Sequence, residues 1–269
     1  MSSLLPVRSV EKPWGRDRLP APFVAPEGKR IGEFWFEPPA ALDDLLVKYL
    51  FASENLSVQV HPDDAQALAA TGRSEGKEEC WLITACEPGA RIGIGFEEPL
   101  DAETLKSAAL DGSIEARMAW FDVVPGDFFY IPANTVHAIG AGCSLIEIQQ
   151  NSDITYRLYD YGRPRELHLD AAIAVAKGEP HPPRMRRRVA ETGEVTLVEG
   201  PLFRLDRLDG ATSPDVRARY EGAFLVIPVS GSATIEGERV AAGQCALVRD
   251  WSSLSIEGDA KILIAQPVL

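Results

Sequence analysis

The chain has little positive charge and few cysteines. Its 269 residues include 27 Lys and Arg against 40 Asp and Glu, a formal net charge of -13. Because nucleic-acid binding generally needs a basic face, we exclude nucleic acid as a general partner. The four cysteines, Cys80, Cys86, Cys143 and Cys245, show no CxxC spacing. In a chain of this size they are predicted to be buried or free thiols in a reducing cytoplasm.

Long apolar runs are also absent. No stretch of the sequence is long and apolar enough to span a bilayer. The opening segment MSSLLPVRSVEKPW lacks the long apolar region of a signal peptide. We therefore expect a cytoplasmic protein with no membrane partner, and the sequence leaves its oligomeric state unknown. The composition, with 45% hydrophobic and 25% charged residues, is that of a globular protein with a sizeable core.

What the sequence does contain is a succession of short, strand-like runs between Pro, Gly and Asp turn signals. In the first half these runs are LLVKYLFA, LSVQVH, CWLITACE, AWFDVV, DFFYIP and SLIEIQQ. From about Glu194 onward only strand-like runs are expected: VTLVEG, FRLDRL, AFLVIPVSG, SATIEG, CALVR and AKILIAQP. Many short strands with regular turns are typical of an all-β sandwich or barrel, here formed twice.

Three helices are expected among the first set of strands. DDAQALAATG begins at a capping aspartate and ends at Gly72, DAETLKSAALDG has the same pattern of Asp cap and terminal Gly, and LDAAIAVAKG ends at Gly178. The segment EPHPPRMRRR that follows is predicted to be a linker or surface crossing, with arginines that are solvated or pair with acids. We expect His168 and His181 at the surface.

The two halves share a sequence pattern. Gly126 is followed by Pro132 and His137, and Gly243 is followed at the same offsets by Arg249 and Leu254. Such an offset is expected of a duplicated fold. The second copy then has an apolar residue where the first has a histidine, so we expect a polar site in the first barrel and no metal in the second.

Two polar side chains share one face of the strand that reads SVQVH. Side chains alternate along a strand, so the valines point one way while Gln59 and His61 point the other. Pro62 then ends the strand pairing and lets the chain leave for a helix. We predict that Gln59 and His61 face the barrel interior beside His137.

A Gly-x5-Pro phrase leading to a histidine resembles the second motif of the cupin superfamily, whose double-sheet barrel holds a metal. Asn134 stands where that motif usually has glycine, and Asn tolerates a positive φ. The segment GKEECWLI adds carboxylates: Glu79 shares a face with Lys77, whereas a one-residue slip would put Glu78 there instead. Two histidines, a carboxylate, an amide oxygen and an open position suit catalytic zinc.

In combination, SVQVHPDD, GKEECW and YIPANTVHAIGAGCSLIEIQQNSDITYRLYDYGR resemble type I mannose-6-phosphate isomerase (phosphomannose isomerase) in its short bacterial form. The resemblance covers roughly the first 165 residues, and the final strands are similar to that family's smaller barrel. It implies a mostly β fold of two cupin-like (double-stranded β-helix, or jelly-roll) barrels with a few short helices. The expected parts are a metal-binding catalytic domain over 1–165, a helix and linker over 166–193, and a metal-free barrel over 194–269.

The resemblance also implies roles for individual residues. It implies one Zn²⁺ per chain with four ligands: Gln59, His61, Glu79 and His137. It makes Lys77 face the sugar or its phosphate and places Glu147 and Arg157 in the active site, Arg157 with a part in catalysis. The proton-transferring base stays open between Glu147, a metal-bound water and Lys77, and Lys77 qualifies only if its site lowers its pKa.

The implied activity is the interconversion of mannose 6-phosphate and fructose 6-phosphate through an enediol(ate), with a sugar phosphate as the small-molecule partner. Two alternatives stay open: a non-catalytic sugar-binding or regulatory cupin, and an isomerase for a different aldose. At the residue level, Lys77 could be a surface lysine, and Arg157 could be an ion-pair partner of Asp153 or Asp160. Binding alone would not need Lys77, Glu147 and Arg157 together, which favours the enzyme.

Overall fold

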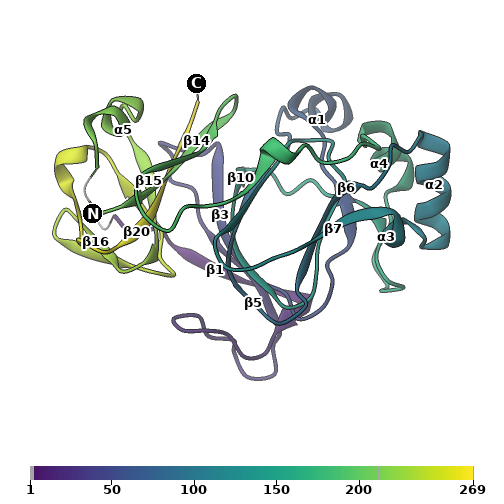
Figure 1. Cartoon of the computed structure of the whole chain (residues 1–269), viewed down its shortest axis with the longest axis horizontal. Coiled ribbons are helices and arrows are strands. Elements are labelled where there is room, and N and C mark those ends of the chain that lie inside the picture. Colours follow the sequence, from purple (N-terminus) through teal and green to yellow (C-terminus); the bar gives the residue numbers. More distant parts are fainter. Residues whose placement is uncertain (1–2, 211, 269) are drawn as a thin grey trace.

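A computed structural model describes residues 3–210 and 212–268 (Figure 1). Two β barrels lie side by side, and this confirms the predicted mostly β fold of two cupin-like barrels. Each run predicted as a strand contains one. In the described residues, no helix is long and apolar enough to cross a membrane.

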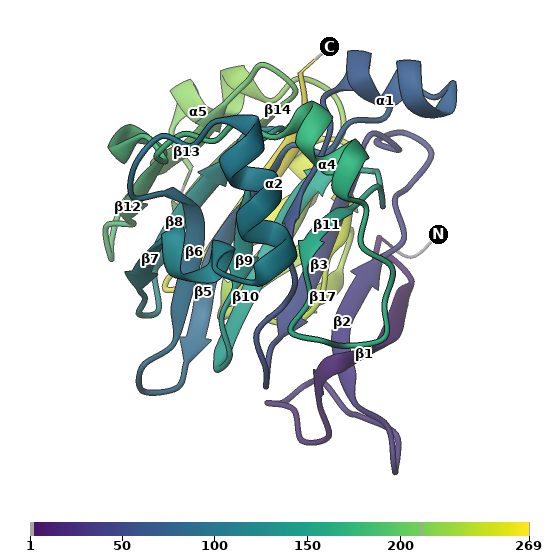
Figure 2. The ribbon, with the colours of Figure 1, turned by 90° about the vertical axis from the view of Figure 1, so that its right-hand side faces the viewer.

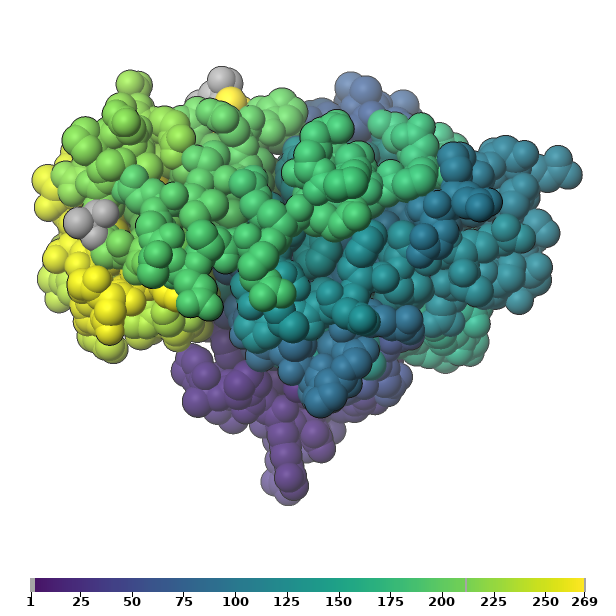
Figure 3. Space-filling model, viewed as in Figure 1, coloured from purple at the N-terminus to yellow at the C-terminus, as the bar shows by residue number. Residues whose placement is uncertain are grey.

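The first barrel is built from two antiparallel sheets. Its larger sheet has the strand order β1 (Val7–Arg16), β2 (Ile31–Phe36), β3 (Leu45–Phe51), β10 (Cys143–Gln150), β5 (Glu79–Cys86), β8 (Asp127–Ile131) and β12 (Arg186–Arg188). The facing sheet has the order β11 (Tyr156–Tyr159), β4 (Val58–Val60), β9 (His137–Ile139), β6 (Arg91–Phe96) and β7 (Met118–Asp122). The loop between β1 and β2 projects from this barrel (Figure 3).

The second barrel repeats the plan with shorter sheets. One sheet runs β13 (Val195–Glu199), β14 (Phe203–Asp209), β20 (Lys261–Pro267), β15 (Phe224–Ser230) and β18 (Ala246–Val248), and the other runs β17 (Glu238–Ala241), β16 (Ser232–Ile235) and β19 (Leu254–Ile256). Gly126 and Gly243 both have positive φ, 92° and 85°. His137 is the first residue of β9, as Leu254 is of β19. The proposed repeat therefore places both residues at the same point of the two barrels.

Helices cover the outer face of the smaller sheet of the first barrel (Figure 2). They are α2 (Ala102–Asp111), α3 (Ile114–Arg117) and α4 (Leu169–Val175), of which α2 and α4 contact β11. Helix α1 (Asp64–Thr71) lies at one end of the barrel, above the sheet in Figure 2. Asp63 and Gly72 cap α1 at its two ends, as predicted. The third helix was predicted to reach Gly178 but ends at Val175, because the next residues pair with the chain before β9: Lys177 N donates to Asn134 O at 2.9 Å.

Three expectations outside the site are wrong. Helix α5 (Pro214–Arg219) lies where only strands were expected, and the Ser213 cap with Pro214 in the first turn is its sequence signal. Part of the supposed linker forms β12, which pairs with β8. Its arginines behave as predicted at Arg188, which forms an ion pair with Asp127. His181 was expected at the surface but is only 5% exposed, and its Nε2 lies 2.9 Å from the Tyr130 carbonyl oxygen.

A shared hydrophobic core joins the two barrels. It packs the outer side of β3, β5 and β10 against the second barrel, with Tyr49, Ile146 and Ile148 on one side and Phe203 and Leu263 on the other. The opposite face of the larger sheet therefore lines the interior of the first barrel. The division at residues 165 and 193 stays a prediction.

Candidate active site

Strand alternation and ladder register bring the polar side chains of β4 and β9 together. Val58 and Val60 are fully buried in the cluster that includes α2 and α4, which turns Gln59 toward the barrel interior. Gln59 is the cross-strand partner of His137. Just past the strand, the His61 carbonyl oxygen accepts from Asn134 N at 2.8 Å. Gln59, His61 and His137 thus meet inside the barrel, as the sequence predicted.

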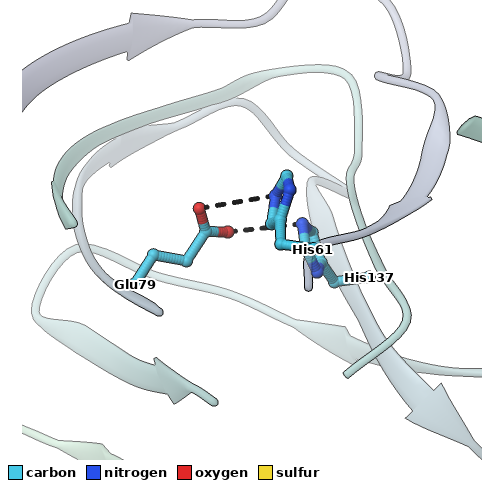
Figure 4. Close-up of side chains that lie close together, drawn as sticks. All are labelled: His61, Glu79 and His137. Carbon is cyan, nitrogen blue, oxygen red and sulfur yellow. Dashed lines mark ion pairs between the residues drawn. The ribbon is translucent and has the colours of Figure 1, made fainter. Parts of the chain in front are cut away.

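Glu79, at the start of β5, faces both histidines (Figure 4). Its Oε2 lies 3.7 Å from His61 Nε2, and its Oε1 lies 3.3 Å from His137 Nε2. The ligand atoms of the three residues all lie within 4.8 Å of one another, and each residue is at most 1% exposed. Glu78 points to the other face of the sheet, where Tyr130 OH donates to it. The predicted choice of Glu79 over Glu78 therefore agrees with the geometry.

Backbone carbonyls set the tautomers of both histidines. His61 Nδ1 lies 2.7 Å from Ile154 O, and His137 Nδ1 lies 2.9 Å from Thr135 O. Each Nδ1 must therefore carry the proton, which leaves an Nε2 lone pair directed at Glu79. Burial lowers the pKa of both imidazoles, to about 4 for His137, and the Lys77 ammonium acts in the same direction. Neutral imidazoles are the form that binds metals.

The donor set fits a divalent cation. Neither oxygen of Glu79 has a hydrogen bond of acceptable geometry within the described residues, although both are buried. The nearest positive charge is the Lys77 ammonium, whose Nζ lies 2.7 Å from Glu79 Oε2 and 3.2 Å from His61 Nε2. Two imidazole lone pairs and a carboxylate that converge on one positive group are the donors that zinc prefers. Burial raises the pKa of Glu79 and outweighs the opposing effect of Lys77.

Gln59 adjoins the cluster through its amide nitrogen. Its Nε2 lies 3.2 Å from His137 Nε2, while its Oε1 accepts from Ser57 Oγ at 3.1 Å. Ligation through oxygen would need the amide to turn over, which exchanges its two ends without moving the backbone. Gln59 as a fourth ligand therefore stays a prediction.

A ladder of alternating charges extends from the cluster along the barrel wall. Lys77 Nζ lies 3.9 Å from Glu147 Oε1, and Lys48 Nζ lies 3.1 Å from the same oxygen. Trp81 Nε1 donates to the other oxygen of Glu147 at 3.0 Å. Burial would raise the pKa of Glu147, but the two ammonium groups outweigh it and lower that pKa. Glu147 is therefore held as a carboxylate.

Lys77 could act as the base only if its site lowered its pKa, and the site does the opposite. Burial would lower the pKa of its ammonium, but the carboxylates of Glu79 and Glu147 outweigh this effect and raise the pKa above its ordinary value. At 5% exposure it is not the surface lysine that the sequence left open. Lys77 is a charged donor at neutral pH, and the role of proton acceptor falls to another group.

Arg157, on β11, lines a cavity of about 200 Å³ that also reaches Gln59, Lys77 and Glu147. Its buried Nε has no hydrogen-bond partner within the described residues. Asp160 instead forms ion pairs with Arg165 at 2.6 Å and with Arg163 at 3.1 Å. The guanidinium of Arg157 is thus available to a ligand. Burial, and next the charge of Arg165, lower its pKa.

Several residues of this cavity were not predicted from the sequence. They are Lys12, Trp14, Glu33 and Trp35 of the β1–β2 hairpin, Lys48 of β3, and Arg165. Lys48 had a visible signal, because LLVKYLF is otherwise apolar and a charged residue in a fully buried strand needs a partner. Its Nζ also lies 4.4 Å from the centroid of the Trp35 ring. The hairpin residues have no such local signal.

A buried histidine–carboxylate cluster inside a double-sheet barrel defines a cupin with a candidate metal centre. No family model matches the chain. It is 39% identical over 205 residues to mannose-6-phosphate isomerase ManA of Bacillus subtilis, covering 72% of this chain and 62% of that protein. It is 31% identical to the probable mannose-6-phosphate isomerase GmuF of the same organism, covering 89% and 82%. The chain belongs to the mannose-6-phosphate isomerase family, and this confirms the resemblance in its motifs.

Solved structures agree on the fold. The mannose 6-phosphate isomerase from Bacillus subtilis superposes with a TM-score of 0.74 at 24% identity and covers 98% of both chains. A variant of phosphomannose isomerase from Salmonella typhimurium superposes with a TM-score of 0.75 at 16% identity and covers 100% of both chains. The two-barrel architecture is therefore that of solved members of the family.

Proposed function

We propose that the protein interconverts mannose 6-phosphate and fructose 6-phosphate through an enediol(ate), with one zinc ion per chain. The observation that carries the proposal is the buried cluster of His61, Glu79 and His137 beside a cavity lined by Lys77, Glu147 and Arg157. The relatives named mannose-6-phosphate isomerase, in Bacillus subtilis and in Streptococcus mutans at 35% identity, support the substrate.

His61, Glu79 and His137 would hold the zinc ion, with Gln59 as a fourth ligand after its amide turns. A bound zinc ion supplies Lewis-acid polarisation of the carbonyl and hydroxyl oxygens at C1 and C2 of the substrate. The reaction moves a proton between those two carbons, so negative charge develops on their oxygens. Lys77 and Arg157 offer donors to that charge from the wall of the cavity. The proton acceptor stays open: Glu33, Glu147 and Asp153 are carboxylates of this wall, and the lowered pKa of Glu147 makes it a weak base. Glu147 also orients the Lys77 ammonium.

The substrate phosphate needs local positive charge, because the net charge of -13 disfavours anions at long range. Five cations line the cavity: Lys12, Lys48, Lys77, Arg157 and Arg165. Lys48 and Lys77 lie beside the carboxylate of Glu147. Lys12 and Arg165 already form ion pairs with Glu33 and Asp160, whereas Arg157 retains a free Nε. We therefore assign to Arg157 either the phosphate or the charge of the enediolate. A guanidinium fork suits both.

A metal analysis coupled to an isomerisation assay tests this proposal. Purified protein should contain about one zinc per chain and convert mannose 6-phosphate to fructose 6-phosphate. Unphosphorylated mannose should react much more slowly, because it lacks the phosphate group that the cations of the cavity would bind. In heavy water, a base that exchanges with solvent should place deuterium on C1 of the ketose. A shielded base would transfer the proton directly, so ketose formation is the stricter criterion.

The same assay separates the alternatives. If metal-loaded protein binds sugar phosphates and forms no ketose, a non-catalytic, regulatory cupin is the better description. If unphosphorylated mannose or another aldose turns over as fast as mannose 6-phosphate, the isomerase remains but the proposed substrate is wrong. Full activity in thoroughly metal-stripped protein would show that the reaction does not need a metal ion. The free thiols of all four cysteines fit a reducing cytoplasm, which is the location that we propose.

A further inference from the structure

Two cysteines that the proposed chemistry does not use face each other across a strand pair. Cys86 is the last residue of β5, Cys143 is the first residue of β10, and the two are direct cross-strand partners. The flanking hydrogen bond runs from Glu87 N to Gly142 O at 3.0 Å. A bond between the residues on either side marks the two cysteines as a non-hydrogen-bonded pair, in which the Cα atoms are typically about 4.5 Å apart.

The two thiols also point toward neighbouring backbone carbonyl groups. Cys86 Sγ donates to Val123 O at 3.3 Å, and Cys143 Sγ donates to Arg91 O at 3.6 Å. These two carbonyls are neighbours, because Arg91 pairs with Asp122, the residue just before Val123. Both cysteines contact the same hydrophobic cluster inside the first barrel. Their side chains are therefore adjacent on one face of the sheet.

We propose that Cys86 and Cys143 form a modification site, at which a peroxide oxidises the two thiols to a cross-strand disulfide. A disulfide needs Cα atoms roughly 4.4–6.8 Å apart and Cβ vectors that converge, and a non-hydrogen-bonded antiparallel pair supplies both. Cys80 has no such partner, because Ile148 lies opposite it on β10. The inference is independent of the proposed isomerase activity.

The positions of the two thiols set the order of the steps. Cys86 is half-buried, so its sulfur is the one that hydrogen peroxide reaches; it takes one oxygen to form a sulfenic acid, and water leaves. The sulfur of Cys143 then attacks the Cys86 sulfur, the S–O bond breaks, and the hydroxide leaves as water with the Cys143 proton. Two thiols are oxidised by two electrons, and one peroxide is reduced to two waters. Burial raises the pKa of Cys143 to about 12, so little of it is thiolate and its attack on the Cys86 sulfur should be the slow step.

The disulfide would close the chain segment from Glu87 to Gly142, which contains β6, β7, β8 and β9. Closing a long loop removes conformations from the unfolded chain, so the oxidised protein should unfold at a higher temperature. Glu79 lies at the other end of β5, about 23 Å away along an extended strand. Oxidation should therefore leave metal content and catalytic activity unchanged.

The experiment treats the reduced, folded protein with hydrogen peroxide, blocks the remaining thiols with N-ethylmaleimide in denaturant, and measures intact mass and linked peptides. We expect two blocked thiols instead of four, a peptide joined through Cys86 and Cys143, and a Tm several degrees higher that dithiothreitol reverses. Cys86→Ser and Cys143→Ala should each abolish the linked peptide, and the matched control Cys245→Ser should retain it.

Three results would overturn the proposal, and all three can be read from the wild-type protein alone. One is the survival of four blockable thiols at peroxide concentrations that oxidise exposed cysteines of a control protein. Another is oxidation of Cys86 to sulfinic acid while Cys143 stays a free thiol, which would mean that the two sulfurs do not meet. A linked peptide joining any other pair of cysteines would also refute the assignment.

Discussion

Two adjacent glutamates, Glu78 just before β5 and Glu79 at its start, have opposite surroundings. Glu79 faces His61 and His137 without a hydrogen bond of acceptable geometry, whereas Glu78 accepts from Tyr130 OH on the far face of the sheet. Glu79→Gln keeps the shape and removes the ligand charge. Because loss of supporting groups alone costs roughly 10–100-fold in metal affinity, loss of this ligand should cost more. Zinc titration of stripped protein measures the effect.

Glu78→Gln is the matched control for that substitution. It removes one negative charge a single residue away, so a general electrostatic effect would weaken metal binding in both variants. We expect zinc affinity to be unchanged within a few fold in Glu78→Gln. Equal losses in the two variants would contradict the assignment of Glu79 as a ligand.

Arg157 should act on turnover rather than on metal content. Suppose that its guanidinium stabilises charge that develops in the enediolate. Arg157→Ala should then raise the activation free energy by about 2.7–4 kcal/mol and lower kcat accordingly, as for a lost oxyanion donor. Zinc content and the fold should survive, because arginine is not a ligand. Arg157→Lys should rescue activity poorly, since an ammonium lacks the fork. A higher KM with unchanged kcat would instead assign Arg157 to binding of the phosphate.

Burial of neutral histidines makes the stability of the metal-free protein depend on pH. The pKa of His137 is about 4 in the folded protein and about 6.5 when unfolded. Below pH 6.5 the unfolded chain takes up a proton that the folded His137 refuses, so the contribution of His137 to stability falls as pH falls toward 4. His137 alone accounts for about 3 kcal/mol of this loss. Glu79 acts in the opposite direction, because burial raises its pKa to about 7.

Thermal unfolding of metal-stripped protein at pH 7 and at pH 5 measures this dependence. His137→Gln should show a smaller decrease in Tm between the two pH values than the wild type. It should not abolish the decrease, because burial also lowers the pKa of His61 and His181. An identical decrease in both proteins would show that His137 is not held neutral.

At the scale of elements, the turn from β8 to β9 positions His137. Asn134 occupies this turn with φ at 72°, and its Nδ2 donates to Gln66 Oε1 at 2.6 Å, which ties the turn to α1. Asn134→Gly and Asn134→Ala both lose that hydrogen bond, but only alanine pays the penalty of a left-handed backbone, roughly 1–2 kcal/mol. Urea denaturation should therefore find the alanine variant less stable by that amount. Equal stability would mean that the turn relaxes.

At the scale of the whole molecule, the shared core should make the two barrels unfold together. Phe203 belongs to the second barrel and is fully buried, and its ring centroid lies 6.4 Å from that of Tyr130 in the first barrel. Phe203→Ala should cost about 3–5 kcal/mol, the usual loss for a buried phenylalanine. Calorimetry should record one transition in the wild type and one, shifted downward, in the variant. Two separate transitions would show that the two domains predicted from the sequence unfold independently.

Local patterns determined much of the site. Alternation along SVQVH places Gln59 and His61 on one face, and the same rule separates Glu79 from Glu78, because side-chain direction in a strand depends only on the parity of the residue number. The capping aspartate and terminal glycine of α1 are equally local. Ser213 and Pro214 carried the same kind of signal for α5, so that helix could have been predicted. The motif set also identified the family, because its predicted ligand residues lie in short continuous segments.

Only the tertiary structure decided which distant groups share the cavity and what charge each carries. Lys48 meets Glu147 from another strand, Trp35 comes from the N-terminal hairpin, and His181 is buried although its segment was predicted to be a surface crossing. Register across the sheet, not sequence spacing, makes these contacts, as it also sets Cys86 opposite Cys143. Lys77 is the clearest case: its pKa depends on two carboxylates that folding brings to it, against the burial that folding also imposes.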